Sequence, residues 1–415
     1  MLKGSTLYSV VIISLVIGVM TTTIIVAAYF YRSQNYKNLL LARLELNAQS
    51  GIAYLLAEKE AIAYNEEKIL DLYGEEKDSV SLIKRHWGLF EAGVVRSFSG
   101  TYSNTKAVLY GYKSSPEDPA IYLTDQGRPL FLCGSTIVKG KCFLPEAGVK
   151  RAFIEGQNYL GNELINGAIE KSGNSLPLLN KNQIDRILNI LKSGNNNDYD
   201  VKEGFSGDTL VHSFFDTTLF IGLKDSLPIR RKNLSGNIIL FSTKLMILDS
   251  SCRMEDVIIF APSVIIKEGF KGSLQVFAKD SLIVEKNCEL KYPSALGLFK
   301  IDVKTHQPFI RIESNSAVRG IVFTAQELTD IDKTKVSILE KSEVEGQVYA
   351  DGSLELKGYV YGNVYCNKFL LRTPSSIYEN HLLNVTIDKT KLSPYFVGSS
   401  LIYSENQKQV AKWLE

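Results

Sequence analysis

The sequence predicts a mainly β protein with a long N-terminal α-helix, in which a transmembrane and stalk helix precedes a small β-sheet region and a C-terminal parallel β-solenoid. Three observations predict it: an uncharged N-terminal run, alternation of apolar and polar residues from Trp87 onward, and a glycine-headed repeat in the C-terminal half. The expected segments are a leader (1–4), the helix (5–64), an α+β head region (65–180), a helix and linker insertion (181–232), the solenoid (233–380) and a C-terminal cap (381–415).

The first of these observations is the absence of charge from Leu7 to Phe30. At about 1.5 Å per residue the run spans roughly 36 Å, enough to cross a hydrocarbon core of about 30 Å. Its many β-branched residues remain compatible with a helix, because a single segment in lipid satisfies its backbone only in that conformation. We therefore expect a single-pass membrane anchor.

A cleaved secretory signal is the alternative, but its apolar region is normally about 7 to 15 residues and ends in small residues. Here the longer run leads into Tyr29, Phe30, Tyr31 and Arg32, a pattern typical of an interfacial belt. Charge does not decide the orientation, because few basic residues flank the run on either side.

Composition excludes some classes of protein. The hydrophobic content of 45% in 415 residues is ample for folded cores. The 47 basic and 45 acidic residues are well mixed, so no basic stripe predicts a nucleic-acid partner.

Cys133 and Cys142 enclose a short loop with Gly134 and Gly140, which would let the chain turn back on itself. A disulfide there would contribute about 2–3 kcal/mol and indicate an oxidising compartment. Two reduced thiols are the alternative.

The helical pattern continues beyond the uncharged run. Leu40, Leu44, Ala48, Gly51 and Leu55 recur at spacings of three and four. One interpretation is a stalk packed on its own domain. The other is an assembly seam for neighbouring copies, formed by Leu44, Ala48, Gly51 and Leu55.

Local patterns predict the elements that follow. The charged stretch 58–85 is expected to be surface helix, with Ile69, Leu70, Leu72 and Tyr73 on its apolar side, whereas 94–113 alternates as a small antiparallel sheet. Residues 134–167 are expected to be glycine-rich short strands, either the beginning of the solenoid or more sheet, and 180–191 is expected to be a short helix before a linker or insertion.

Glycine recurs ahead of a β-branched and aromatic pair in GNIILFS, GSLQVFA, GIVFTA, GQVYADG and GNVYCN. Phe241, Phe260 and Phe277 follow one another at a similar spacing, which favours stacked parallel coils about 4.8 Å apart. An antiparallel sandwich is the alternative, because 292–305 interrupts the repeat. In the coil arrangement a further coil separates Cys252 from Cys288, so Cys252, Cys288 and Cys366 are expected to be buried and reduced.

Motifs for chemistry are few. The four histidines, His86, His212, His306 and His381, are far apart, and no zinc, nucleotide or nucleophile-elbow motif is present, so neither a metal nor a cofactor is expected and the chain is not expected to be an enzyme. A polysaccharide-degrading β-helix is a weaker alternative, with Asp249, Glu255, Asp256, Asp280 and Glu285 as its acids.

Four tyrosines crowd the last repeats, either as a capping layer or as a surface for a glycan or protein ligand: Tyr349, Tyr359, Tyr361 and Tyr365. The terminal piece with Val410, Trp413 and Leu414 is amphipathic and is expected to cap the solenoid or dock on a partner.

The N-terminal stretch LKGSTLYSVVIISLVIGVM resembles the type IV pilin and pseudopilin superfamily, and LARLELNAQSGIAYLLA is similar to a segment of its minor subunits. The resemblance implies cleavage of a leader after Gly4 and methylation of Ser5. The family's major subunits carry a glutamate at the position of Ser9, where it pairs with a neighbour's N-terminal amine. Its absence implies a minor or initiating subunit, or no filament at all.

The C-terminal repeats are weakly similar to bactofilin-like β-solenoids, which supports the fold more than a function. Together the resemblances imply a minor pilin-like subunit in a bacterial inner membrane, single-pass, with most of the chain extracytoplasmic. Its expected partners are the membrane and other pilin-like subunits or assembly-platform proteins. A solitary anchored solenoid, acting as an envelope scaffold or adhesin, is the first alternative.

Overall fold

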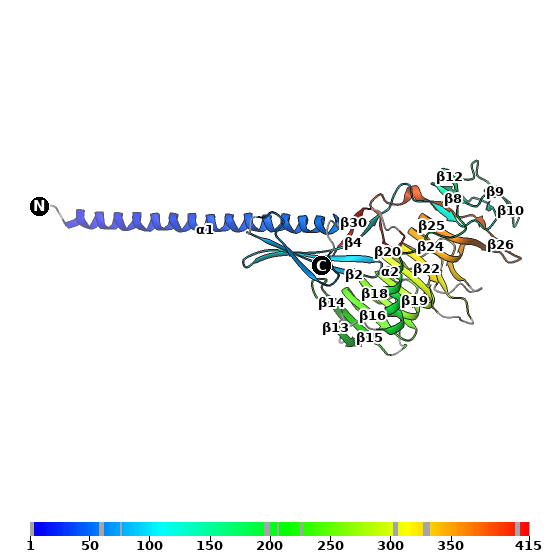
Figure 1. Cartoon of the computed structure of the whole chain (residues 1–415). Coiled ribbons are helices and arrows are strands. Elements are labelled where there is room, and N and C mark those ends of the chain that lie inside the picture. The colour runs from blue at the N-terminus through cyan, green and yellow to red at the C-terminus, as the bar shows by residue number, and fades with distance from the viewer. Residues whose placement is uncertain are drawn as a thin grey trace. The chain divides into compact units, whose positions relative to one another are not determined.

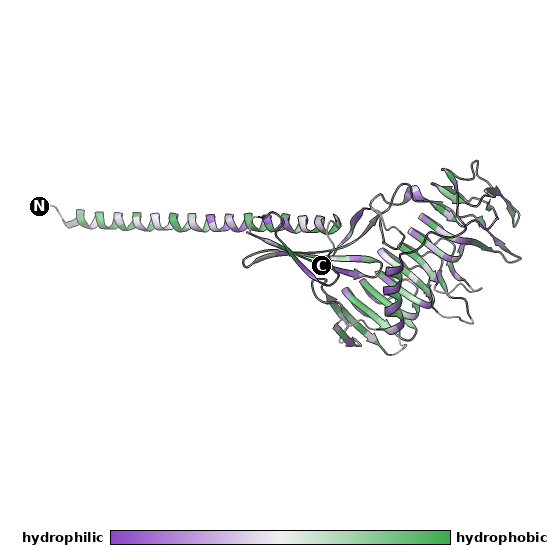
Figure 2. Cartoon of the chain, viewed as in Figure 1, coloured by the Kyte–Doolittle hydropathy of each residue, from purple (hydrophilic) through white to green (hydrophobic). Residues whose placement is uncertain are grey.

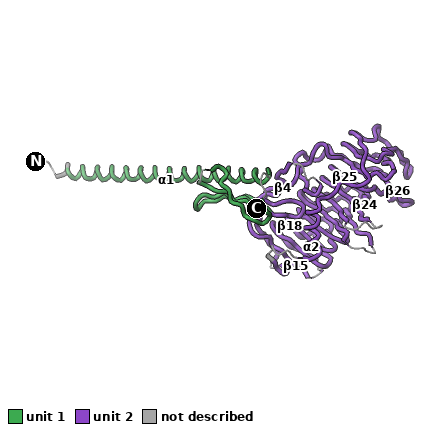
Figure 3. The backbone as a smooth tube through the Cα atoms, in the orientation of Figure 1, with its two compact units in different colours: residues 1–84, 94–106 green, residues 85–93, 107–415 purple. Residues whose placement is uncertain are grey.

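A computed structural model describes residues 4–57, 62–74, 77–194, 200–205, 207–224, 226, 228–301, 306–326, 333–402 and 407–414. The described chain is mainly β, with a long N-terminal helix, α1 (Gly4–Ala57), and one further α-helix, α2 (Lys181–Ser193) (Figure 1). Its contacts divide it into two compact units, residues 1–84 with 94–106 and residues 85–93 with 107–415 (Figure 3). The two units are described separately.

The first unit contains α1 and the strands that cover its C-terminal half. Leu44, Ala48, Ile52 and Leu55 of α1 are buried. A Cβ atom added to Gly51 would lie 2.6 Å from Val95, with Val80 and Leu82 also within contact, so the helix lies directly on β-strand side chains. Glycine permits this close approach.

The same unit corrects the prediction of a helix over 58–85, because its described residues form β1 (Glu67–Leu70) and the start of β2 (Ser79–Trp87). These strands pair antiparallel, with Glu67 opposite Ile83. Val80 and Leu82 stand two residues apart and are buried on one face, so the relevant period is two. The charged residues between apolar ones obscured this alternation.

One six-stranded sheet has the order β1-β2-β3-β4-β29, and β30 also pairs with β4. The division between the units falls inside β2, β3 and β4. The predicted strands are present in β3 and β4, and the C-terminal amphipathic piece is itself a strand, antiparallel to β4, with Val410 opposite Tyr110. The bounds are β3 (Phe90–Ser99), β4 (Tyr102–Lys113), β29 (Val397–Gly398) and β30 (Lys408–Leu414).

The second unit is built around parallel strands whose pairings close into a barrel. The strands that carry it stand side by side in Figure 1, each hydrogen-bonded to the next. In this order they are β15 (Leu219–Leu223), β16 (Asn233–Ser242), β18 (Arg253–Ile266), β19 (Lys271–Val284), β20 (Glu289–Lys300), β22 (Ala317–Gln326), β24 (Glu343–Leu356) and β25 (Tyr359–Arg372). Shorter parallel partners are β13 (Asp200–Glu203), β14 (Thr209–His212), β17 (Met246–Leu248), β21 (Phe309–Ile312) and β23 (Thr334–Ile338).

The predicted parallel direction is confirmed, and the antiparallel sandwich is wrong. Phe241 pairs with Phe260 and Phe260 with Phe277, so the spaced phenylalanines occupy one register. The first part of the interrupting segment 292–305 lies in β20, where the register shifts between the pairs Gly272–Leu290 and Gln275–Ala295, and residues 302–305 lie outside the described residues. The extra residues are absorbed as a bulge.

The repeated glycines are required by close backbone approach. Gly346 pairs with Gly320 on one side and Gly362 on the other, and its φ is +141°. A Cβ at Gly346 would lie 2.0 Å from the Gly320 carbonyl oxygen. A side chain at this register would therefore collide with the neighbouring strand.

The spatial order of the second unit differs from the order along the chain. Val364 of β25 pairs in parallel with Ile121 of β5, which in turn pairs with β8. Within the expected 65–180 head region, β5, β8 and β12 therefore extend the parallel strands after β25, whereas the strands within 67–113 belong to the six-stranded sheet. The strands at this end are β5 (Ile121–Leu123), β6 (Leu130–Cys133), β7 (Ile137–Lys139), β8 (Cys142–Leu144), β9 (Val149–Arg151), β10 (Phe153–Ile154), β11 (Gln157–Asn158), β12 (Ile169–Lys171), β26 (Ile377–Glu379), β27 (His381–Leu383) and β28 (Thr386–Asp388).

The predicted helix at 180–191 is confirmed as α2. The Asn180 side chain accepts from the Gln183 amide at its start, and Gly194 ends it in the left-handed conformation. Ile187, Leu188 and Leu191 are buried, and the helix contacts β18 and β19. It is thus packed on the parallel strands, and is not only a linker.

Candidate membrane anchor and assembly helix

The N-terminal part of α1 is a candidate membrane span. By length and composition Leu7–Ala57 contains a window apolar enough to cross a bilayer, and none of that window is buried within the structure. Figure 2 shows that apolar residues predominate along this part of the helix. Apolar side chains exposed on every side of a helix fit a lipid environment.

The hydroxyl groups in this stretch form hydrogen bonds inside the helix. Ser14 donates to the Val11 carbonyl at 2.9 Å, Thr22 to that of Gly18 at 2.8 Å, and Thr23 to that of Val19 at 2.8 Å. Because each hydroxyl proton has an acceptor within the helix, these residues reduce the cost of placing polar groups in lipid.

The residues implicated by the pilin resemblance lie at the start of this helix. α1 begins at Gly4, and residues 1–3 of the leader, like the side chain of Ser5, lie outside what the structure describes. Ser9 is exposed on the helix. The position implied for a family glutamate is thus on the surface of the candidate span.

The four predicted seam residues face the strands of their own unit. Leu44 and Ala48 are fully buried, Leu55 is 2% exposed, and Gly51 contacts Val80 and Val95. This is the arrangement of the alternative interpretation, a stalk packed on its own domain. The apolar spacing of three and four identified the right face of the helix, but a sequence alone does not say which surface covers it.

Polar contacts fix this part of the helix further. Glu45 accepts hydrogen bonds from Lys106 and, at 2.8 Å each, from Gln49 and Asn104, and these bonds lower the pKa of Glu45. Arg43 Nε lies 2.5 Å from an oxygen of Asp78. The strands are therefore joined to α1 by charge as well as by apolar burial.

A different face of the same helix remains exposed. Tyr36, Leu39 and Leu46 are 70%, 65% and 61% exposed. Spacings of three and seven place them on one side of a helix with 3.6 residues per turn. Beyond the uncharged run, α1 thus keeps an apolar face that its own strands do not cover.

The predicted disulfide is wrong, because Cys133 and Cys142 are both free and buried. Cys133 lies in β6, which pairs with β9 and β27, whereas Cys142 lies in β8 and packs in the core of the parallel barrel. The two thiols belong to different sheets and different apolar clusters. Thiol chemistry therefore gives no indication of an oxidising compartment.

The other thiols follow the prediction. Cys252, Cys288 and Cys366 are free and at most 2% exposed. Since Arg253 pairs with Lys271 and Lys271 with Glu289, Phe270 stands between Cys252 and Cys288 in register. Burial raises the pKa of Cys288 to about 11.

Several acids of the enzymatic alternative are engaged in ordinary contacts. Asp256 lies 2.7 Å from Lys412, and Glu285 lies 2.7 Å from Lys267. Asp249 accepts from Ser251 at 2.7 Å.

The register also keeps these acids apart. Lys267 lies between Asp249 and Glu285 on neighbouring parallel strands, so these two carboxylates are not adjacent. Glu255 pairs in register with Ser273, and Asp280 lies in β19 beside Ser281. Among the described residues, no cluster of His, Cys, Asp or Glu could hold a metal ion.

The tyrosines of the last repeats divide into two sets. Tyr349 and Tyr365 are 4% and 3% exposed, and the Tyr349 hydroxyl donates to the Pro177 carbonyl at 2.8 Å. Tyr359 and Tyr361 are partly exposed and stack with centroids 6.4 Å apart. The buried set favours the capping layer.

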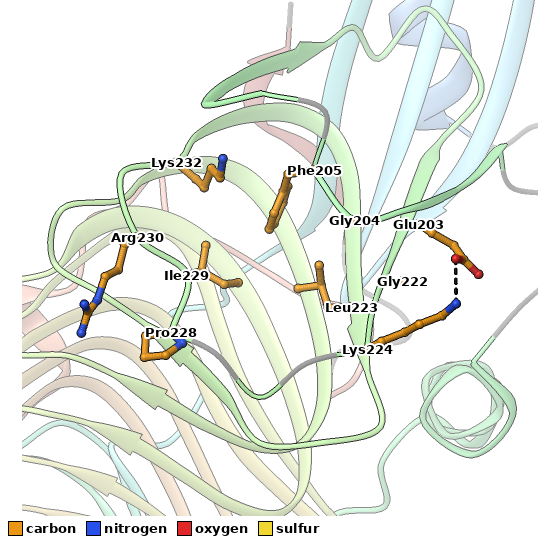
Figure 4. Close-up of a pocket in the computed structure, with 10 residues that line it drawn as sticks. All are labelled: Glu203, Gly204, Phe205, Gly222, Leu223, Lys224, Pro228, Ile229, Arg230 and Lys232. Carbon is orange, nitrogen blue, oxygen red and sulfur yellow. Dashed lines mark hydrogen bonds and ion pairs between the residues drawn. The ribbon is translucent and has the colours of Figure 1, made fainter.

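A pocket of about 480 Å³ lies beside β13 and β15 (Figure 4). Its apolar wall contains Phe205, Leu223 and Ile229. Its charged groups are paired: Lys224 with Glu203 at 2.7 Å, Lys232 with Asp208 at 2.7 Å and Arg230 with Asp249 at 3.6 Å. Its described lining therefore holds no uncompensated charge for a ligand.

Comparison with known proteins adds little to this geometry. No protein-family model matches the chain, and no curated protein matches it. Among solved structures it is similar to the competence-associated pilin ComZ from Thermus thermophilus, at 11% sequence identity and a TM-score of 0.25, over 92% of this chain and 95% of that one. A likeness at this level carries no argument about fold or function, which therefore rest on the helix and strands themselves.

Proposed function

We propose that this chain is a non-enzymatic, membrane-anchored minor subunit of a pilin-like filament or secretion assembly. The observation that carries the proposal is the division of α1 into two parts. The first is apolar and exposed along the candidate span, and the second, including Leu44, Ala48 and Leu55, is buried on strands of its own unit. Such a helix can anchor a folded head in a membrane and also pack against other helices.

The exposed face formed by Tyr36, Leu39 and Leu46 supports an assembly role. Large apolar side chains that cluster on one face are covered by lipid or by a partner. In this proposal the partner is the helix of another pilin-like subunit or an assembly-platform protein.

Ser9 supports a minor or initiating position. A serine cannot form the ion pair with a neighbour's N-terminal amine that the pilin resemblance assigns to a glutamate. The chain would then enter an assembly through the apolar face of α1 and without that charge contact. We place it in a bacterial inner membrane as a single-pass protein with its head outside the cytoplasm.

The head in this proposal is a β-solenoid. Gly320, Gly346 and Gly362 follow one another in register, with a core of Val322, Val348 and Val364 on neighbouring strands. Each strand pairs with the strand before and after it, as coils of a solenoid do.

A solitary anchored scaffold or adhesin is a second candidate. It is favoured by the burial of Leu44, Ala48, Gly51 and Leu55 within their own unit and by the absence of a carboxylate at Ser9. In that case the anchor would hold the head at the membrane without helix partners. The weaker carbohydrate-active alternative would require loss of polysaccharide cleavage when Asp249, Asp256 and Asp280 are each replaced by Asn.

The test is mass spectrometry of the mature N-terminus, using the full-length chain recovered from its native membrane. We expect a chain that begins at N-methylated Ser5, and a Gly4→Val variant that keeps Met1. Gly18→Ala, in the same helix, is the matched control and should be processed normally, because nothing lies within 4 Å of its added Cβ. An intact Met1 in the unaltered protein would overturn the filament proposal and favour the solitary anchor.

Assembly itself is tested by cross-linking between thiols. Leu39→Cys and Leu46→Cys should each form cross-links to another pilin-like subunit, because both positions are exposed on one face of α1. Lys286→Cys, on an exposed turn, serves as the control for random collision. Equal cross-linking at all three positions would contradict a specific helix interface.

A further inference from the structure

We propose that a polar groove on the parallel strands binds a carboxylated saccharide. The groove has a volume of about 370 Å³ and is lined from β24, β25 and the residues beside β21 and β23. Its described lining includes three basic residues, Lys333, Lys368 and Arg372, and no acidic or aromatic side chain. A concave site with one sign of charge attracts ligands of the opposite sign.

The register explains why these groups gather on one face. Leu354 of β24 and Phe369 of β25 pair with each other and point into the barrel core. Ser353 and Lys368, one residue earlier on each strand, therefore point outward, and Leu370 and Arg372 follow on the same face of β25. Parallel pairing thus aligns a hydroxyl and two cations.

Two of the three cations are available to an anion. Arg372 and Lys333 are exposed, and neither forms an ion pair with a described residue. Glu355, the carboxylate that interacts electrostatically with Arg372, is paired with Lys335. Lys368 lies 3.2 Å from Glu379, which also contacts Arg128. Arginine presents paired N–H donors that match the two oxygens of a carboxylate, so Arg372 is the expected carboxylate contact and Lys333 a second charge.

Ser353 gives an independent indication that a ligand completes the site. The residue is 2% exposed, yet its Oγ is buried without a hydrogen-bond partner in the described part of the chain. Buried hydroxyls almost always have a partner. Its register neighbour Lys335 is already bonded to Glu355, and so a ligand oxygen is the partner that the groove lacks.

Amide side chains suit the hydroxyl groups of a sugar. The Asn367 side-chain nitrogen donates to Asp351 at 3.1 Å, which leaves the side-chain oxygen Oδ1 of Asn367 to accept. Gln126 and Gln307 line the same groove. Amides donate and accept, as sugar hydroxyls do, and the volume is sufficient for about one or two sugar rings. Since no aromatic ring offers a stacking platform, charge and hydrogen bonding have to provide the affinity.

The inference does not depend on assembly into a filament. It is tested by calorimetric titration of the full-length chain in detergent micelles with trigalacturonate, with its fully methyl-esterified form as an uncharged probe and inorganic phosphate as a free anion. We expect trigalacturonate to bind, and Arg372→Gln and Lys333→Gln each to weaken binding by about tenfold or more. Ser353→Ala should also weaken binding without lowering the unfolding midpoint. Lys286→Gln, an exposed lysine outside the groove, should bind as the unaltered protein does.

Several outcomes would overturn the proposal. If the methyl ester bound as tightly as trigalacturonate, the groove would not recognise the charge. If phosphate bound as tightly, the groove would not recognise the sugar. Arg372→Gln with unchanged affinity would place the ligand elsewhere. An oligonucleotide that binds as tightly through the same residues would make the groove a nucleic-acid site, and no binding of trigalacturonate at millimolar concentration would exclude a saccharide site of this kind.

Discussion

Lys408 of the C-terminal strand lies 2.8 Å from the Glu91 carboxylate of β3, and the two side chains are only 5% and 11% exposed. The ammonium group also lies 5.4 Å from the ring centroids of both Tyr110 and Tyr112 on β4. A strand near the end of the chain is therefore held by a buried ion pair within an aromatic setting. Because both charges are buried, each one is stable in the fold only while the other charge compensates it.

Removing one partner of this pair should be costly. Glu91→Gln or Lys408→Met should lower the free energy of unfolding by about 3–5 kcal/mol, because a buried charge is left uncompensated. The double variant Glu91→Leu with Lys408→Met should recover much of that loss. Denaturant unfolding in detergent micelles measures all three, and a loss below about 1 kcal/mol in Glu91→Gln would mean that the pair is solvated.

Gly51 tests whether α1 packs on its own strands. An added Cβ would lie 2.6 Å from Val95 and 2.8 Å from Val80, so Gly51→Ala should destabilise the first unit by about 1–3 kcal/mol. Gly18→Ala is the control, and we expect no destabilisation from it. Unchanged stability of Gly51→Ala, together with loss of assembly, would restore the seam interpretation. Limited proteolysis in micelles gives the readout.

Gly346 tests the close approach of neighbouring parallel strands. Gly346→Ala should cost about 2–4 kcal/mol, because its Cβ would collide with the Gly320 carbonyl and its φ of +141° is unfavourable for alanine. At Gly222, in β15, nothing lies within 4 Å of an added Cβ. Gly222→Ala should therefore be close to neutral in the same unfolding measurement, and equal effects would contradict the register.

His381 should make stability depend on pH. Its ring stacks on Phe131 with centroids 4.3 Å apart, and burial lowers the pKa of His381 although its hydrogen bond to the Glu379 carbonyl acts in the opposite direction. Between the folded pKa and the unfolded value of about 6.5, the unfolded chain binds more protons. This contribution to stability is complete above about pH 6.5 and falls as the pH drops through that window.

The measurement is the denaturant midpoint at pH 7.5, 6.5 and 5.5. His381→Phe keeps an aromatic ring against Phe131 but does not titrate, so its midpoint should change less across this range. A variant that retains the full slope would assign the pH dependence to another group.

The cysteines should be reduced and protected. Burial raises the pKa of Cys142 to about 12, and so little thiolate is present near neutral pH. Maleimide should label the native protein slowly, and the denatured chain should take up five labels with or without prior reduction. Three labels without reductant and five with it would reveal a disulfide.

The sequence predicted those elements whose hydrophobic spacing or glycine repeat is contained in one continuous segment of the chain. The uncharged run and the spacing of Leu44, Ala48 and Leu55 predicted α1 and its buried face, and the repeated glycines predicted parallel neighbours. The stretch 58–85 was assigned wrongly because strand alternation at Val80 and Leu82 is short and surrounded by charges.

Other features depend on contacts between distant segments, and a local pattern does not contain them. The Cys133–Cys142 spacing suited a loop, but the two strands enter different sheets. The groove around Ser353 was not predicted because its residues come from separate strands, and only the register brings Ser353 beside Lys368. Aligning the repeated strands and noting the polar residues at their outward-facing positions would have brought Ser353 and Lys368 together from the sequence.

The place of β5 also affects how the chain can be made. The Thr124 hydroxyl after β5 donates at 2.9 Å to the Asn367 carbonyl, 243 residues away. During synthesis, the segment 121–171 would emerge early, and the edge of β5 that pairs with β25 would stay open until β25 is made. Such late closure is slow and leaves strand edges open to misassociation. A nascent chain released before Asn367 is synthesised would retain that exposed edge, which makes it a natural substrate for chaperones and for quality-control proteases.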